Sequence, residues 1–172
     1  FMAGKLEGFE GQYPTLKDWE DHMTTAFPEV RLKKFLEMRG ADGGPWAKIW
    51  ALPAFWTGLL YDDEARAAAY HMISVWTHEE HVHLRDSVPR TALHTPFRNQ
   101  TVRDLALEAL NISHGGLCRR SRLDGMGLDE THFLRTLFQT AESGLTPAEE
   151  LLAAYEGRWN NSICPVFQEY AY

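Results

Sequence analysis

The stretch FPEVRLKKFLEMRGADGG, residues 27–44, decides how the rest of the chain is interpreted. If residues 30–39 form one strand, successive side chains alternate between its two faces. One face then carries Val30, Leu32, Lys34, Leu36 and Met38. The other face carries Arg31, Lys33, Phe35, Glu37 and Arg39. The first face is mostly apolar and suits a core, whereas the second places three cations and one carboxylate in a row.

This charged face is unusual because the chain as a whole is acidic. Its 172 residues carry a formal net charge of -7, with 44% hydrophobic and 24% charged residues, which is typical of a globular domain. The acidity argues against general nucleic-acid binding and favours a local phosphate site. The longest apolar stretch, residues 49–61, is shorter than the roughly 20 residues of a membrane span and contains Pro53, so no membrane partner is expected.

Cysteine content and the chain start give an expected location. Cys118 and Cys164 are too few for a disulfide scaffold, and the first residues lack the basic and apolar regions of a secretory signal. We therefore expect a cytoplasmic, reduced protein. The chain opens with Phe1 and Met2 and enters a polar loop, which favours the C-terminal part of a longer protein over an arbitrary boundary.

Capping signals and apolar spacing predict a series of helices after the charged strand. Thr77 with Glu80 and Thr146 with Glu149 have the capping-box arrangement, and Thr15 precedes an acidic first turn. The expected helices cover residues 45–60, 63–76, 77–86, 101–117, 129–144, 146–157 and 165–170. The helices that begin near residues 129 and 146 should form a helix hairpin.

The predicted fold class is α+β, with one strand followed by about seven helices. A lone strand is unstable because its backbone groups need neighbours. Its sheet partners should come from residues 1–14, from another chain or from a missing N-terminal part. We expect residues 1–172 to form a single C-terminal fragment, with residues 1–44 contributing an active-site segment to a sheet and residues 45–172 forming a helical layer.

Two further groups of residues are candidate sites. His78, His81 and His83 fail the zinc-protease spacing because Val82 occupies the place of the second ligand, so a solvent-exposed helix face is favoured. The aromatic residues between 46 and 61 have helical spacing and favour core packing. Trp46 is the exception, because it follows a flexible Gly-Gly-Pro turn and is placed to wall a pocket.

The charged face of the strand allows two interpretations. One is a solvated edge. The other is a metal–nucleotide site, in which a carboxylate holds Mg²⁺ and cations offset phosphate oxygens. The polar flanks favour the second interpretation, because His22, Thr24 and Thr25 precede the strand and the loop at residues 40–44 follows it.

Several segments resemble one known family. They are DHMTTAFPEVRLKKFLEMRGADGGPW (residues 21–46), ALPAFWTGLLYD (51–62), TPFRNQTVRDLALEAL (95–110), TPAEELLAAYEGRW (146–159) and PVFQEYAY (165–172). Together they resemble the C-terminal part of glutamate–cysteine ligase of the plant and proteobacterial type. The resemblance implies a glutamine-synthetase-like antiparallel sheet that lines a funnel for ATP, Mg²⁺ and glutamate.

The resemblance also implies roles for individual residues. Glu37 would be a metal ligand, and Arg39 would clamp the phosphoryl group or glutamate. Arg31 and Lys33 would be supporting catalytic cations. Substrate binding would involve His22, Thr24, Thr25 and Trp46. The remaining metal carboxylates and the nucleotide loops would lie in the missing N-terminal part, so the fragment alone should be inactive.

The implied reaction is the first step of glutathione biosynthesis. ATP would phosphorylate the γ-carboxylate of glutamate, and the amine of cysteine would attack the acyl phosphate to give γ-glutamylcysteine. Two alternatives stay open: a non-catalytic helical interaction or regulatory module, and a related ligase with another amine acceptor. The sequence does not separate cysteine from other acceptors, because no thiol-recognising group is identifiable in this segment.

Overall fold

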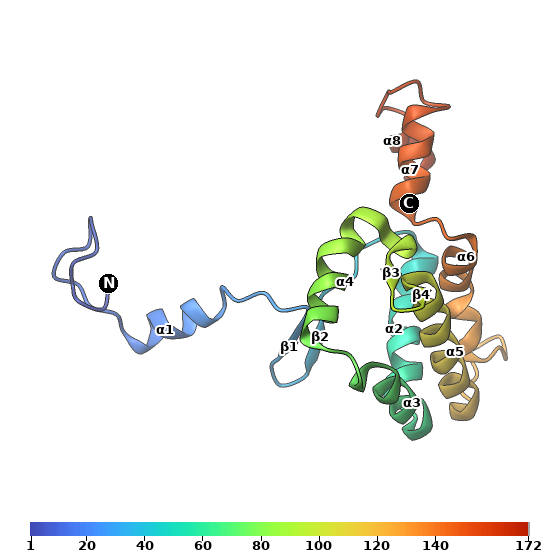
Figure 1. Cartoon of the computed structure of the whole chain (residues 1–172), viewed down its shortest axis with the longest axis horizontal. Helices are drawn as coiled ribbons and strands as arrows, with labels where there is room; N and C mark the ends of the chain where they lie inside the picture. Colours follow the sequence, from blue (N-terminus) through green and yellow to red (C-terminus); the bar gives the residue numbers. More distant parts are fainter. Residues whose placement is uncertain (172) are drawn as a thin grey trace. The chain divides into compact units, whose positions relative to one another are not determined.

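A computed structural model describes residues 1–171 and divides the chain into two units, Phe1–Asp42 and Gly43–Tyr172 (Figure 1). The first unit contains α1 (Leu16–Met23), β1 (Val30–Leu32) and β2 (Leu36–Met38). The second contains α2 (Trp46–Leu60), α3 (Asp63–Ser74), α4 (His78–Thr91), η1 (Ala92–His94), β3 (Pro96–Phe97), β4 (Gln100–Thr101), α5 (Val102–Arg120), η2 (Glu130–Leu134), α6 (Arg135–Ser143), α7 (Pro147–Glu156) and α8 (Val166–Glu169). Helices predominate and both sheets are two-stranded and antiparallel, which agrees with an α+β class.

Residues 30–39 form a β-hairpin, so the prediction of one continuous strand was wrong. β1 pairs with β2 in antiparallel register, with Val30 opposite Met38. The backbone N–H of Lys33 donates to the carbonyl of Phe35 at 2.9 Å within the turn at residues 33–35. The first half of this segment therefore pairs with its own second half, and pairing with another chain or with a missing part stays a prediction.

The division into a charged and an apolar face survives the turn. Directly opposed residues of an antiparallel pair lie on the same face, and Arg31 is opposite Glu37. The apolar face carries Leu32 and its partner Leu36, but it is not the core that the alternation predicted. Leu32 is 78% exposed and Leu36 is 58% exposed, and no residue between 1 and 42 is buried.

The helices of the second unit begin where the capping residues predict. The Thr77 hydroxyl accepts the backbone N–H of Glu80 at 3.2 Å, and the Glu80 carboxylate accepts the backbone N–H of Thr77 at 2.8 Å. The same box opens α7 at Thr146. Helix α4 runs to Thr91, beyond the end predicted at residue 86, and includes a proline. All three histidines of its first turns are exposed, as expected.

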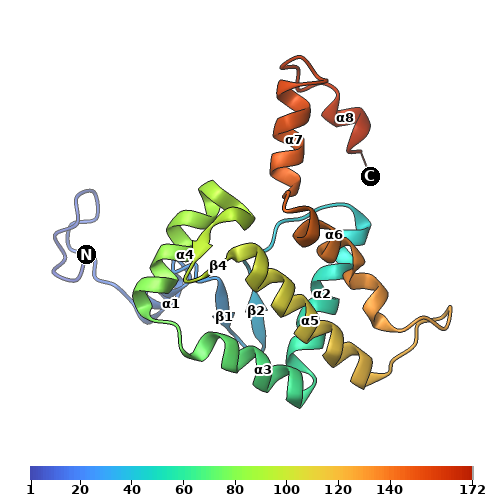
Figure 2. The ribbon, with the colours of Figure 1, turned by 45° about the vertical axis from the view of Figure 1, so that its right-hand side comes forward.

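Helices α2 and α5 form the centre of the second unit (Figure 2). They come unusually close at Gly58 and Gly116, where a methyl group on either glycine would overlap backbone of the facing helix. The buried Ser113 hydroxyl donates to the carbonyl of Phe55 at 2.8 Å, so the polar group in this contact has a partner. Leu117 and Leu134 are fully buried beside it and complete the core.

The C-terminal helices depart from the expected helix hairpin. Gly144 ends α6 in a left-handed conformation, with φ of 73°, but α6 and α7 do not pack side by side (Figure 2). Instead, Trp159 is buried after α7, and its indole N–H donates to Glu169 of α8 at 2.8 Å. Among residues 1–171, no helix combines the length and apolar character that crossing a membrane requires.

Candidate functional site

The hairpin brings the four charged residues of the predicted site together. Arg31 Nε donates to Glu37 Oε2 at 2.7 Å across the two strands. This hydrogen bond lowers the pKa of Glu37, and the charges of Arg31, Lys33 and Arg39 lower it further against the opposing effect of partial burial. Glu37 is therefore held as a carboxylate at neutral pH, inside a cluster that has more positive than negative charge.

Arg39 is the residue of this cluster with an unused donor. It follows β2, and its backbone N–H continues the ladder by donating to the carbonyl of Glu29 at 2.8 Å. Its guanidinium carbon lies 5.0 Å from the ring centre of Phe27, in cation–π geometry. Its Nη1 is buried and donates to no described residue. A buried guanidinium donor without an acceptor is uncommon in proteins, and an anionic group would satisfy it.

The described residues do not make a complete magnesium site. Glu37 supplies one carboxylate, and Arg31 already occupies its Oε2. Mg²⁺ requires octahedral oxygen coordination, in which carboxylates and waters share the positions. No group of three or more His, Cys, Asp or Glu residues in the described part of the chain could hold a metal ion. Glu37 can thus contribute one ligand, and the others would have to come from elsewhere.

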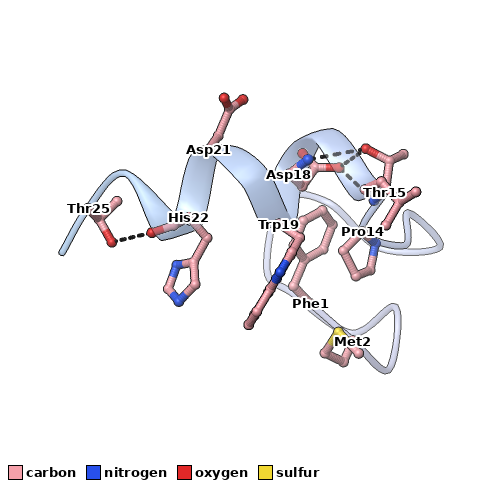
Figure 3. A pocket seen from close by; sticks show the side chains of 10 residues that line it. Phe1, Met2, Pro14, Thr15, Asp18, Trp19, Asp21, His22 and Thr25 are labelled. Carbon is pink, nitrogen blue, oxygen red and sulfur yellow. Dashed lines mark hydrogen bonds between the residues drawn. The ribbon is translucent and has the colours of Figure 1, made fainter. Parts of the chain in front are cut away.

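The predicted substrate-binding residues of the first unit, His22, Thr24 and Thr25, lie at the end of α1, and Figure 3 shows His22 and Thr25 there. The hydroxyl of Thr24 donates to the carbonyl of Asp21 at 2.6 Å, and that of Thr25 donates to the carbonyl of His22 at 2.7 Å. Both hydroxyls therefore close the last turn of the helix, which leaves only their acceptor lone pairs for another group.

His22 also borders a hollow of about 820 Å³ on the first unit (Figure 3). Its ring lies 5.9 Å from the ring of Trp19. The lining is largely apolar and comprises Phe1, Met2, Pro14, Thr15, Leu16, Asp18, Trp19, Asp21, His22 and Thr25. Sequence reasoning singled out His22 and Thr25 but missed Trp19, although Leu16, Trp19 and Met23 have the spacing of one helix face.

Trp46, the last predicted substrate-binding residue, belongs to the second unit. It is the first residue of α2, it is 64% exposed, and its ring stacks on that of Trp50 with centres 6.3 Å apart. The structure therefore places this tryptophan in an exposed aromatic pair, and its role as a pocket wall stays a prediction.

A second hollow, of about 510 Å³, was missed in the sequence. It lies between α5 and the η2–α6 segment and has a mixed polar lining, formed by Asn111, His114, Thr131, Arg135, Phe138, Gln139 and Glu142. The signal was available, because Asn111 and His114 are three residues apart, and Arg135, Phe138 and Glu142 follow three- and four-residue spacing. Such spacing places each set on one side of its helix.

Comparisons with known proteins agree in one family. Residues 4–169 match the family model described as glutamate-cysteine ligase family 2. The chain is 56% identical over all its 172 residues to glutamate–cysteine ligase A, chloroplastic, of Oryza sativa subsp. indica, and covers 34% of that relative. It is 49% identical to the chloroplastic enzyme of Nicotiana tabacum and 48% identical to that of Arabidopsis thaliana, again over its full length and 32% of each relative.

The comparisons correct the expected location. These relatives are named as chloroplastic proteins, which contradicts the cytoplasmic location predicted from the sequence. That prediction rested on the low cysteine count and on the first residues of the chain. Neither feature distinguishes the cytoplasm from a chloroplast. The chain spans about a third of the length of the curated relatives that it matches.

Proposed function

The chain belongs to glutamate-cysteine ligase family 2, and on this basis we propose that it forms the C-terminal third of an enzyme that joins glutamate to cysteine. The reaction would consume ATP, require Mg²⁺ and pass through phosphorylation of the γ-carboxylate of glutamate. Its product would be γ-glutamylcysteine, the precursor of glutathione. By similarity to the relatives, the enzyme would act in the chloroplast. The whole protein would contain a glutamine-synthetase-like antiparallel sheet.

The unused donor of Arg39 is the observation that supports a phosphoryl or carboxylate site at the hairpin. A planar guanidinium can donate two parallel hydrogen bonds to a phosphate or carboxylate. The phosphoryl group in transfer carries charge on its equatorial oxygens, and arginine stabilises that charge electrostatically. Phe27 supports one face of the guanidinium and so limits its orientations. We therefore assign Arg39 as the anion clamp.

Arg31 has a different role in this proposal, because its Nε is already committed to Glu37. It positions the Glu37 side chain and keeps it ionised, which leaves Oε1 as the atom available to a cation. Lys33 lies in the exposed turn and adds positive charge without a described contact to Glu37. Bound Mg²⁺ would neutralise phosphate charge, with most of its ligands supplied by residues outside this chain.

The decisive experiment measures steady-state kinetics of the full-length ligase. Arg39→Lys should lower kcat about 100- to 1,000-fold and raise KM for ATP much less, because lysine keeps the charge but loses the planar fork. Glu37→Gln should weaken Mg²⁺ dependence, and raised Mg²⁺ should recover part of the rate. Lys34→Gln is the matched control, because Lys34 lies in the same turn as Lys33 and does not contribute to the lowered pKa of Glu37.

Near-normal kcat for both Arg39→Lys and Glu37→Gln would end the site assignment. The 172-residue chain alone should release ADP only at the background rate, because it supplies a single carboxylate of the cluster. Turnover by this chain at an ordinary enzymatic rate, about 1 to 1,000 per second, would contradict the proposal that the rest of the enzyme is required.

A further inference from the structure

The second hollow, between α5 and the η2–α6 segment, has the size and lining of a site for a small polar ligand. Its volume of about 510 Å³ lies within the range usual for small-molecule sites. Helix α5 packs against both η2 and α6, so the walls belong to one folded unit. Two residues of α5, one of η2 and four of α6 line the hollow: Asn111, His114, Thr131, Arg135, Phe138, Gln139 and Glu142.

Two oppositely charged side chains of this hollow lack a partner among residues 1–171. Arg135 and Glu142 are both exposed, and the ion pairs of the described second unit join other residues. Arg103 donates to the backbone carbonyls of Ala141 and Glu142, and not to the Glu142 carboxylate. The hollow therefore presents one cation and one carboxylate that the described chain leaves to another group.

This pair of charges selects a ligand that carries both signs. Glu142 would repel a simple anion, and Arg135 would repel a simple cation. A guanidinium recognises a carboxylate through parallel hydrogen bonds, and a carboxylate accepts hydrogen bonds from an ammonium group. A zwitterion with its carboxylate at Arg135 and its ammonium group at Glu142 satisfies both side chains.

The spacing of the two charged residues sets the length of the ligand. Seven residues separate Arg135 from Glu142 on α6, which is about 10 Å along the axis at 1.5 Å per residue. A free amino acid carries both charged groups on one carbon atom, which is too short for that span. An extended peptide covers about 3.5 Å per residue, so two or three residues fit.

The remaining lining suits the middle of such a peptide. Gln139 lies between the two charged residues on α6, and Asn111 faces the hollow from α5. Their amide groups both donate and accept hydrogen bonds, as peptide groups require. Phe138 adds an apolar surface, and the His114 ring lies edge-on to it with ring centres 6.3 Å apart.

We propose that this hollow binds a free peptide of two or three residues, with its carboxylate on Arg135 and its terminal ammonium group on Glu142. The site belongs wholly to the second unit, whose core surrounds Leu117 and Leu134. No residue of the β1–β2 hairpin takes part, so peptide binding does not depend on the proposed ligase chemistry.

Nuclear magnetic resonance of the isotope-labelled 172-residue chain tests the proposal without any turnover. Addition of the tripeptide Gly-Leu-Gly should shift the amide signals of residues 111–114 and 135–142 in a saturable way, with a Kd on the order of 1 mM. Free glycine should bind at least about 10-fold more weakly, because it reaches only one of the two charged residues.

Matched variants and end-blocked peptides locate the two contacts. Arg135→Gln should weaken binding of the tripeptide about 5- to 10-fold, and amidation of the peptide carboxylate should then cost nothing further, because both changes remove the same contact. Glu142→Gln and acetylation of the peptide amine should behave in the same way. Arg90→Gln and Glu156→Gln are the controls, because each removes an exposed charge of the second unit outside the hollow.

Four results would overturn the proposal. The absence of saturable shifts at residues 111–142 would show that the hollow binds no peptide. Equal affinity for glycine would contradict the length argument. Undiminished binding of the acetylated or amidated peptide to the unmodified chain would show that the charged ends are not recognised, whatever the stability of the variants. Equal weakening in the two controls would show that overall charge, and not Arg135 and Glu142, attracts the peptide.

Discussion

The two units contain similar kinds of side chain but use them differently. In the second unit, apolar residues of α2, α5 and η2 meet, and Leu117 and Leu134 are fully buried. In the first unit, Leu32, Leu36 and Trp19 are all more than half exposed. The second unit is thus stabilised by contacts within this chain, whereas the first has local hydrogen bonds and one ion pair without a core.

The comparison shows that the catalytic residues proposed above lie on the part of the chain with the least stability of its own. Positions of functional groups must be held closely for catalysis, and an isolated hairpin does not provide that rigidity. Precision at Arg39 would therefore depend on contacts beyond those of the hairpin itself.

The largest expected contrast comes from matched leucine substitutions in the 172-residue chain. Leu117→Ala should lower the free energy of unfolding by about 3 to 4 kcal/mol, because it removes a fully buried side chain and leaves a cavity. Leu32→Ala should change it by less than about 0.5 kcal/mol, as exposed positions usually do. Urea unfolding monitored by circular dichroism measures both, and equal effects would remove the distinction between the units.

A smaller effect is expected at the contact between α2 and α5. Gly116→Ala should lower the free energy of unfolding by about 2 to 3 kcal/mol, because the added methyl meets the carbonyl of Gly58, which cannot move aside without shifting the helix. Gly115→Ala is the control on the same helix. Its methyl would meet only the flexible end of Arg119 at 3.5 Å, so better helix propensity should leave stability equal or slightly higher. Thermal unfolding that ranks the two variants in the reverse order would contradict close helix packing.

The smallest expected effect is a change in acid sensitivity. The hydrogen bonds from Arg98, then from the Thr77 backbone, lower the pKa of Glu80 from 4.5 to about 2. The folded chain then binds fewer protons than the unfolded chain, so Glu80 contributes stability above pH 4.5 that is lost as the pH falls through about 2.

In Glu80→Gln, the urea concentration at the midpoint of unfolding should fall less between pH 5 and pH 3 than it does in the unmodified chain. Glu37→Gln should not have this effect, although the pKa of Glu37 is also lowered, because Glu37 lies in the unit without a core. Identical pH profiles for the two variants would show that the units unfold together.

Local signals explain what the sequence could predict of the fold. The pairs Thr77–Glu80 and Thr146–Glu149 open helices because the capping interactions involve only four consecutive residues. The turn at residues 33–35 was missed because Lys-Lys-Phe contains none of the usual turn residues. The hairpin of β3 and β4 was also missed, since it places Arg98, a residue with no special turn preference, at φ of 53°.

The candidate site was predictable to a similar extent. Alternation placed Arg31 and Glu37 on one face, and the antiparallel turn preserved that relation because it pairs the two directly. Alternation does not report whether a face is covered, so the apolar side was taken for a core. The cation–π contact between Phe27 and Arg39 could not be predicted either, because it joins residues twelve positions apart on either side of an unrecognised turn.

The close approach of α2 and α5 has a consequence for synthesis on the ribosome. The α2 helix ends at Leu60, but its main partner is complete only at Arg120, so sixty more residues must be translated before the pair can form. At about 5 to 20 residues per second this takes roughly 3 to 12 s. During that interval the α2 surface that carries Ala51, Ala54 and Gly58 lacks its partner helix in the nascent chain, so a slowed ribosome would prolong the exposure of this surface to chaperones and to misfolding.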